Sequence, residues 1–85
     1  MGYKAEYSKT AEKYLDRQTK SVKLRIMDAI DALPEGDISK LVGREGYRLR
    51  VGSFRVLFDY TGRLSTDGRA IIDIVAIAPR GSVYK

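Results

Sequence analysis

The sequence predicts an α+β fold, in which an N-terminal strand and a helical hairpin pack on a mostly antiparallel four-stranded sheet. Three observations predict this class. Apolar residues alternate at the start of the chain, recur at helical spacing through residues 11–33, and dominate three later extended segments. Helices that are segregated in sequence from a run of strands are typical of α+β layers. At 85 residues, the whole chain (1–85) is expected to form a single domain.

The first two elements are a short strand and a helix. Apolar and charged residues alternate over residues 2–7, which is the pattern of a half-buried strand. Ser8 follows at a position typical of a helix N-cap, where the side-chain oxygen accepts a hydrogen bond from an otherwise unsatisfied backbone N–H. This helix is expected to run to about Arg17.

A second helix follows, with Thr19 or Ser21 as its N-cap. Its apolar residues fall on one face, and they are Val22, Ile26, Ala29, Ile30 and Leu33. Pro34 and Gly36 are expected to end it. Residues 34–46 then form a connection with at most a brief ordered piece.

Three strands account for most of the remaining chain. Residues 47–60 have the pattern of two strands joined by Gly52-Ser53, and a glycine at the first position of a two-residue turn is typical of a type II′ hairpin. A loop is expected over residues 61–68. The last strand, residues 70–78, is apolar on both faces apart from Asp73, which favours a central place in the sheet.

The turn fixes which residues of the hairpin face each other. Arg50 is expected opposite Arg55, and Arg48 opposite Leu57. Since paired residues share a face, these three arginines project from one side. The other side, which is expected to meet the helices, carries Tyr47, Leu49, Val51, Phe54, Val56 and Phe58. Like charges placed opposite each other destabilise a sheet, and a phosphate bound between the guanidinium groups would offset that cost. The alternative is three solvated arginines screened by salt.

Residues outside the hairpin extend this arginine face. Asp59 is expected on the same face, where it would partly neutralise the arginines. Arg80 and Tyr84 follow the last strand and could fold over the face, with the tyrosine ring available for stacking on a base. The alternative for Tyr84 is that it covers an apolar edge.

The amino-acid composition limits which partners, catalytic mechanisms and metal sites are possible. Sixteen Lys and Arg residues against eleven Asp and Glu give a net charge of +5, which suits a polyanionic partner or simply a soluble basic surface. There is no histidine and no cysteine, which excludes histidine catalysis, disulfides and thiolate metal sites. Residues 1–10 do not have the pattern of a signal peptide, no apolar run is long enough to span a membrane, and a cytoplasmic protein is expected.

The hairpin segment Tyr-Arg-Leu-Arg-Val-Gly-Ser-Phe-Arg-Val, residues 47–56, resembles the core motif of the RelE/ParE toxin superfamily. The segment Arg-Gly-Ser-Val-Tyr, residues 80–84, matches the closing motif, and the resemblance covers nearly the whole chain. It implies a RelE-like fold and the toxin of a type II toxin–antitoxin system. Such RelE-like toxins are endoribonucleases (mRNA interferases) that cut mRNA in the ribosomal A site and inhibit translation. The RNA 2′-hydroxyl attacks, and neither metal nor cofactor is required.

The resemblance also implies site residues. The positions that match the catalytic set are Arg48, Arg50, Arg55, Arg80 and Tyr84. The positions expected to bind RNA are Lys40, Arg44 and Lys85. The best-known members have lysines at the first two strand positions, one of them proposed as general base. Arginine stays protonated and is a poor base, so Glu45 could substitute, or catalysis could rest on electrostatics alone.

The resemblance further implies partners. A cognate RelB-like antitoxin, acidic and partly disordered when free, would hold the toxin, and operator DNA would be bound only through that antitoxin. Ribosome and mRNA are the expected targets, with no membrane involved. Two other functions are alternatives: a ParE-like DNA gyrase inhibitor without nuclease activity, and a basic nucleic-acid-binding domain without catalytic activity. The retained arginines and Tyr84 argue against the gyrase inhibitor.

Overall fold

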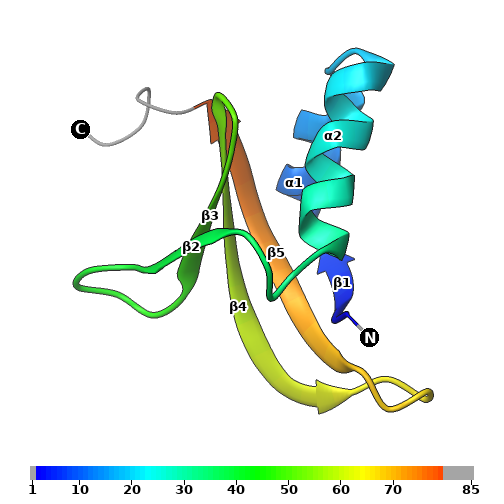
Figure 1. The fold of residues 1–85 in the computed structure, drawn as a ribbon, viewed down its shortest axis with the longest axis vertical. Helices are drawn as coiled ribbons and strands as arrows, with labels where there is room; N and C mark the ends of the chain where they lie inside the picture. The colour runs from blue at the N-terminus through cyan, green and yellow to red at the C-terminus, as the bar shows by residue number, and fades with distance from the viewer. Residues whose placement is uncertain (1, 80–85) are drawn as a thin grey trace.

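The computed structural model describes residues 2–79 of the chain (Figure 1). Its elements in chain order are β1 (Lys4–Tyr7), α1 (Lys9–Asp16), α2 (Lys20–Asp31), β2 (Asp37–Lys40), β3 (Tyr47–Val51), β4 (Phe54–Leu64) and β5 (Ala70–Pro79). None of the helices in residues 2–79 is long and apolar enough to cross a membrane.

The strands form a single sheet in the order β1-β5-β4-β3-β2. β1 is parallel to β5, and every other neighbouring pair is antiparallel. The α+β class and the mostly antiparallel sheet are therefore confirmed. β5 lies between β1 and β4 and is hydrogen-bonded on both sides, as its apolar composition predicted.

The sheet has five strands where the sequence predicted four. The additional strand is β2, which lies within the segment predicted as a connection and pairs with β3. Its four residues carry two charges and too little apolar alternation to predict a strand. Pairing with the neighbouring strand, a tertiary effect, makes this segment extended.

Both helix N-caps follow the sequence. Ser8 and Thr19 have extended backbone and accept hydrogen bonds from Ala11 and Val22. Ser8 also donates to the carbonyl of Val75 at 2.8 Å, where β5 shifts its register against β4. The start of α1 is thereby joined directly to the sheet.

The hydrophobic core lies between the helices and one face of the sheet. Figure 1 shows α1 and α2 on the same side of the curved sheet, with the β2–β3 loop projecting on the other side. α1 packs on β5, and α2 packs on β3. Fully buried side chains from both layers include Ile26, Ile30, Leu33, Leu49, Val56, Phe58, Ile72 and Ile74. The predicted apolar face of the hairpin is confirmed.

The loop predicted at residues 61–68 is shorter than expected, because β4 continues to Leu64. The extension is polar, so no apolar alternation indicated it. It is held instead by hydrogen bonds and ion pairs. Thr61 Oγ1 donates to the carbonyl of Ile71 at 2.8 Å, and Arg63 Nη2 lies 2.8 Å from Glu6 Oε1.

Candidate functional site

The hairpin register agrees with the prediction at every position. Arg50 pairs with Arg55, and Arg48 pairs with Leu57. Gly52 has φ +56°, and no residue other than glycine has positive φ within residues 2–79. These dihedrals fit a type II′ turn with Ser53 at its second position. A correct turn placement was therefore enough to put three arginines on one face.

The three arginines Arg48, Arg50 and Arg55 differ in solvent exposure, which the sequence did not indicate. Arg55 is only 8% exposed, whereas the Arg50 side chain is 41% exposed and Arg48 is half-buried. Arg55 lies between Arg50 on β3 and Ala78 on β5 in the register of the sheet. The picture of three equally solvated arginines is therefore wrong. A guanidinium removed from water interacts more strongly with an anion, because the local dielectric is lower.

Little negative charge accompanies these arginines in residues 2–79. The nearest carboxylate pair is loose, with Arg50 Nη1 4.0 Å from Oδ2 of the exposed Asp37. Asp59 does not neutralise the cluster as predicted. It pairs across the strands with Asp73, and its Oδ1 accepts a hydrogen bond from the Tyr60 backbone at 2.9 Å. Within residues 2–79, Asp59 therefore does not reduce the positive charge of the arginine face.

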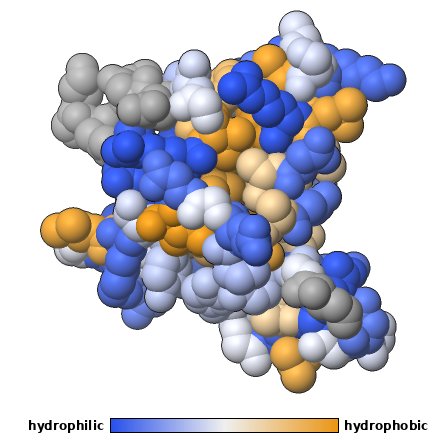
Figure 2. Space-filling view, viewed as in Figure 1, coloured by the Kyte–Doolittle hydropathy of each residue, from blue (hydrophilic) through white to orange (hydrophobic). Residues whose placement is uncertain are grey.

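A hollow of about 350 Å³ adjoins the arginines on the same face. It lies between the β2–β3 loop and the strands, and its lining residues are Lys40, Leu41, Val42, Arg44, Arg48 and Leu57. Arg48 Nε is buried and has no hydrogen-bond partner within residues 2–79. Figure 2 shows the end of the projecting loop as an orange, hydrophobic patch beside blue, hydrophilic residues. Two predicted RNA-binding positions, Lys40 and Arg44, therefore line a hollow together with Arg48.

The charged groups of Lys40 and Glu45 are less closely associated with the arginines. Lys40 is among the residues that line the hollow, but its ammonium lies 5.1 Å from the centroid of the Tyr47 ring, on the residue with which it pairs. Glu45 is exposed in the β2–β3 loop and is not among the residues lining the hollow. Arg80, Tyr84 and Lys85 lie outside the described residues.

Sequence reasoning missed three residues near this face. Val42 and Leu57 supply apolar walls of the hollow, and apolar side chains gave no functional signal. Arg25 lies on the exposed side of α2, and its Nη2 is 2.6 Å from where a Cβ on Gly52 would be. No sequence pattern singled out Arg25, and the packing of α2 brings it close to the turn at Gly52.

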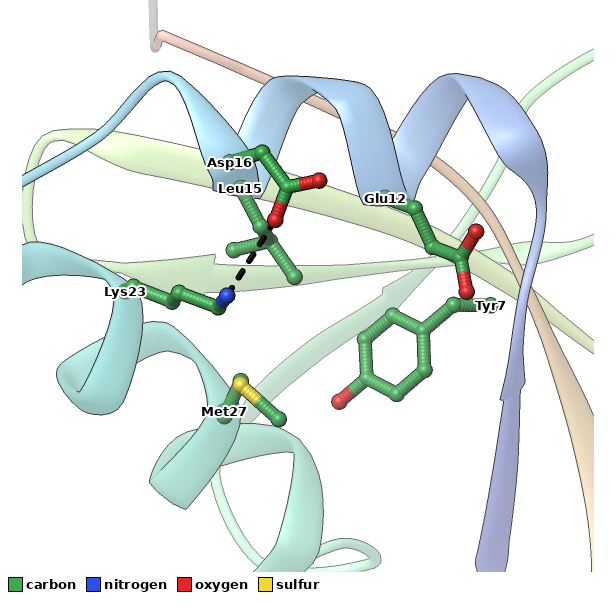
Figure 3. A pocket seen from close by; sticks show the side chains of 6 residues that line it. All are labelled: Tyr7, Glu12, Leu15, Asp16, Lys23 and Met27. Carbon is green, nitrogen blue, oxygen red and sulfur yellow. Dashed lines mark hydrogen bonds and ion pairs between the residues drawn. The ribbon is translucent and has the colours of Figure 1, made fainter. Parts of the chain in front are cut away.

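A second hollow, of about 310 Å³, lies between α1 and α2 (Figure 3). It is lined by Tyr7, Glu12, Leu15, Asp16, Lys23 and Met27. Two of its charged groups pair with each other, as Lys23 Nζ lies 3.2 Å from Asp16 Oδ1. Burial, followed by the negative charge of Asp31, raises the pKa of Tyr7 to about 12. No arginine lines this hollow, and the anion-binding features lie elsewhere.

Comparison with solved structures gives clear matches. The chain is similar to a chain of the archaeal RelE-RelB complex from Pyrococcus horikoshii OT3, with 27% identity and a TM-score of 0.66 over 98% of this chain and 100% of that chain. It is also similar to a chain of the toxin–antitoxin complex RelBE2 from Mycobacterium tuberculosis, with 16% identity and a TM-score of 0.68 over 94% and 100%. No protein-family model and no curated protein matches.

Proposed function

We propose that this chain, a member of the RelE-like toxin superfamily, is the toxin of a type II toxin–antitoxin system and cleaves mRNA in the ribosomal A site. One observation carries the proposal: Arg50 and Arg55 face each other across the hairpin, with Arg48 at the next position on that face. The similarity to a RelE-RelB structure at 27% identity over almost the full chain supports it.

The proposed reaction is an internal phosphoryl transfer. The RNA 2′-hydroxyl attacks the adjacent phosphorus and the bond to the 5′ oxygen breaks, which leaves a cyclic phosphate and a free 5′-hydroxyl. Negative charge builds on the non-bridging oxygens, and guanidinium groups stabilise it through paired hydrogen bonds. Arg55, which is nearly buried, is expected to contribute most per contact because little water screens it.

Two proton transfers accompany this reaction. We assign Glu45 as the acceptor of the 2′-hydroxyl proton, because it is exposed in the loop beside the arginine face and can approach a bound RNA. The departing 5′ oxygen takes its proton from water. Arg80 would contact the phosphate, and Tyr84 would stack on a nucleotide, by their match to the family motif. No metal or cofactor takes part in the proposed reaction.

The proposed partners follow from charge. An acidic, RelB-like antitoxin would cover the arginine face and neutralise part of the net charge of +5. The ribosome and its mRNA are the proposed targets in the cytoplasm. Operator DNA would be bound through the antitoxin.

The test is to induce the chain in cells and map mRNA 5′ ends on ribosomes. Cleavage within codons in the A site is expected, and Arg50→Gln, Arg80→Ala and Tyr84→Ala should each reduce it strongly. Arg63→Gln is the charge-matched control, because Arg63 lies at the far end of β4 and pairs with Glu6. Glu45→Gln should slow cleavage and flatten its dependence on pH.

A gyrase inhibitor of the same fold is the alternative. Intact mRNA together with broken or abnormally supercoiled DNA would favour that alternative. The grouping of Arg48, Arg50 and Arg55 on one face favours the nuclease, since three neighbouring guanidinium groups match the phosphate of an RNA chain. Unchanged growth on expression would contradict both functions.

A further inference from the structure

The hollow beneath the β2–β3 loop combines two kinds of wall. Arg44 and Arg48 contribute positive charge, while Val42 and Leu57 contribute apolar surface. Val42 is 96% exposed, the most exposed large hydrophobic residue in the described part of the chain. Exposed apolar side chains are common singly, but this one stands at the rim of a hollow and between basic residues.

Arg48 has an unsatisfied donor at this position. Its Nε is removed from solvent and has no hydrogen-bond partner within residues 2–79. Buried polar atoms in folded proteins nearly always have a partner, and leaving one without a partner costs free energy. The guanidinium nevertheless stands at the wall of the hollow, and an anion bound there would contact its terminal Nη groups instead of the buried Nε.

The hollow lies close to the proposed site of cleavage. The Arg48–Leu57 pair is the next pair on the same face after Arg50–Arg55, two residues along each strand. At about 3.4 Å per residue, the two pairs are ~7 Å apart. If one phosphate of an RNA chain binds between Arg50 and Arg55, the next nucleotide of that chain can therefore reach the hollow.

We propose that this hollow is a binding subsite for the nucleotide next to the scissile phosphate. Its base packs between Val42 and Leu57, and its phosphate accepts hydrogen bonds from Arg48 and Arg44. A nucleotide carries an anionic group and a flat ring with apolar faces in one unit, which matches both kinds of wall. An acidic peptide would satisfy the arginines and leave the apolar wall exposed. The inference rests on the proposed function and adds where the flanking nucleotide lies.

Binding can be measured on the complete chain with labelled methyl groups. Titration with a 5′-mononucleotide is expected to shift the NMR resonances of Val42 and Leu57. Inorganic phosphate at the same ionic strength should leave those methyl resonances in place. Arg44→Gln should weaken mononucleotide binding about tenfold, the loss of a charge-assisted hydrogen bond, whereas Arg63→Gln should not change it.

Kinetics on mRNA provide an independent readout. Val42→Ser and Arg44→Gln should each raise KM severalfold and leave kcat unchanged, because both act on the flanking nucleotide. Leu64→Ser is the matched control, since Leu64 is 69% exposed at the distal end of β4. A fall in kcat with unchanged KM would overturn the subsite, as would methyl resonances that do not respond to mononucleotides.

Two further outcomes separate the inference from the function on which it rests. Methyl shifts with mononucleotide combined with intact mRNA in cells would support the subsite and contradict only the proposed cleavage. Shifts that appear only with a glutamate-rich peptide would overturn the subsite and identify the hollow as a place where an acidic protein segment docks.

Discussion

Arg50 and Arg55 lie directly opposite each other in the β3–β4 hairpin, with Arg50 at the surface and Arg55 nearly buried. Such a pair works against the sheet that contains it, because like charges at directly paired positions repel. The proposed binding of an anion at this face would offset the repulsion. The two arginines also differ in solvent exposure, so their contributions to stability and binding can be separated by mutation.

Replacing Arg50 with threonine should stabilise the fold. The change removes a like-charge pair, which is worth a few tenths to about 1 kcal/mol, and introduces a residue that favours strands. The loose, exposed contact with Asp37 offsets little of this. Urea unfolding of the variant and the parent measures the difference. If Arg50→Thr lost more than about 1 kcal/mol, the pair would have to be counted as part of the fold.

Phosphate should raise the melting temperature of the chain. At a phosphate concentration tenfold above its Kd, binding to the folded state contributes about 1.4 kcal/mol, or ~5 °C for a domain of this size. Arg50→Thr should abolish most of the increase. Sodium chloride at equal ionic strength is the control. If sodium chloride raised the melting temperature equally, the effect would be general screening of charge instead of binding at a site.

Gly52→Ala should destabilise the hairpin mainly through its backbone. The residue has φ +56°, which costs a residue with a Cβ about 1–2 kcal/mol. The new Cβ would also lie 2.6 Å from Arg25 Nη2, but this atom ends a flexible side chain that can move aside at small cost. Adding Arg25→Ala should therefore recover little of the loss, and a double-mutant cycle by thermal unfolding measures both contributions. Full recovery in the double variant would contradict the backbone contribution.

Ser8→Ala should cost more than Thr19→Ala, although both remove a helix N-cap. The Ser8 hydroxyl accepts from Ala11 N at 3.0 Å and also donates to Val75 O at 2.8 Å. The Thr19 hydroxyl accepts from Val22 N at 3.3 Å, and it makes no second hydrogen bond within residues 2–79. We expect about 2 kcal/mol for Ser8 and ~1 kcal/mol for Thr19. Equal losses in denaturant titrations would show that the bond to β5 contributes nothing.

Alkaline pH should destabilise the chain through Tyr7. Burial and the charge of Asp31 raise the pKa of its hydroxyl to about 12 in the folded state, against 10.0 for a free tyrosine. The unfolded chain therefore loses this proton first. The stabilising contribution is complete below pH 10 and is lost as the pH rises toward 12.

Tyr7→Phe tests this dependence. Its stability relative to the parent should improve by about 1–3 kcal/mol between pH 9 and pH 12, because phenylalanine has no proton to lose. Other titrating groups are common to both proteins and cancel in the difference. Chemical denaturation across that range measures it, and parallel curves would place the Tyr7 hydroxyl in contact with water.

The elements that could be predicted from sequence are those defined by local chemistry. Ser8 and Thr19 are caps because their side chains reach the free backbone groups of their own helices. Gly52 fixed the hairpin register because few other residues accept its backbone conformation. The arginine face followed directly from that register.

What could not be predicted depends on contacts between distant segments. β2 is extended because β3 lies beside it, and the extension of β4 is held by partners as distant as Glu6 and Ile71. The burial of Arg55 and the orientation of Lys40 toward Tyr47 likewise depend on neighbouring strands. The hollow beneath the β2–β3 loop depends on the conformation of that loop, and the sequence of residues 41–46 has no pattern that predicts this conformation.

The parallel pairing of β1 with β5 affects when the chain can fold during its synthesis. Lys4 pairs with Ile71 and Tyr7 with Ile74, so the first strand finds its partner only after the last one has been synthesised. Contacts this distant in sequence form slowly, because a long loop must close first. A growing chain on the ribosome should therefore stay incompletely folded until β5 has emerged. For a protein proposed to attack ribosomes, this would delay activity until the ribosome has translated past β5.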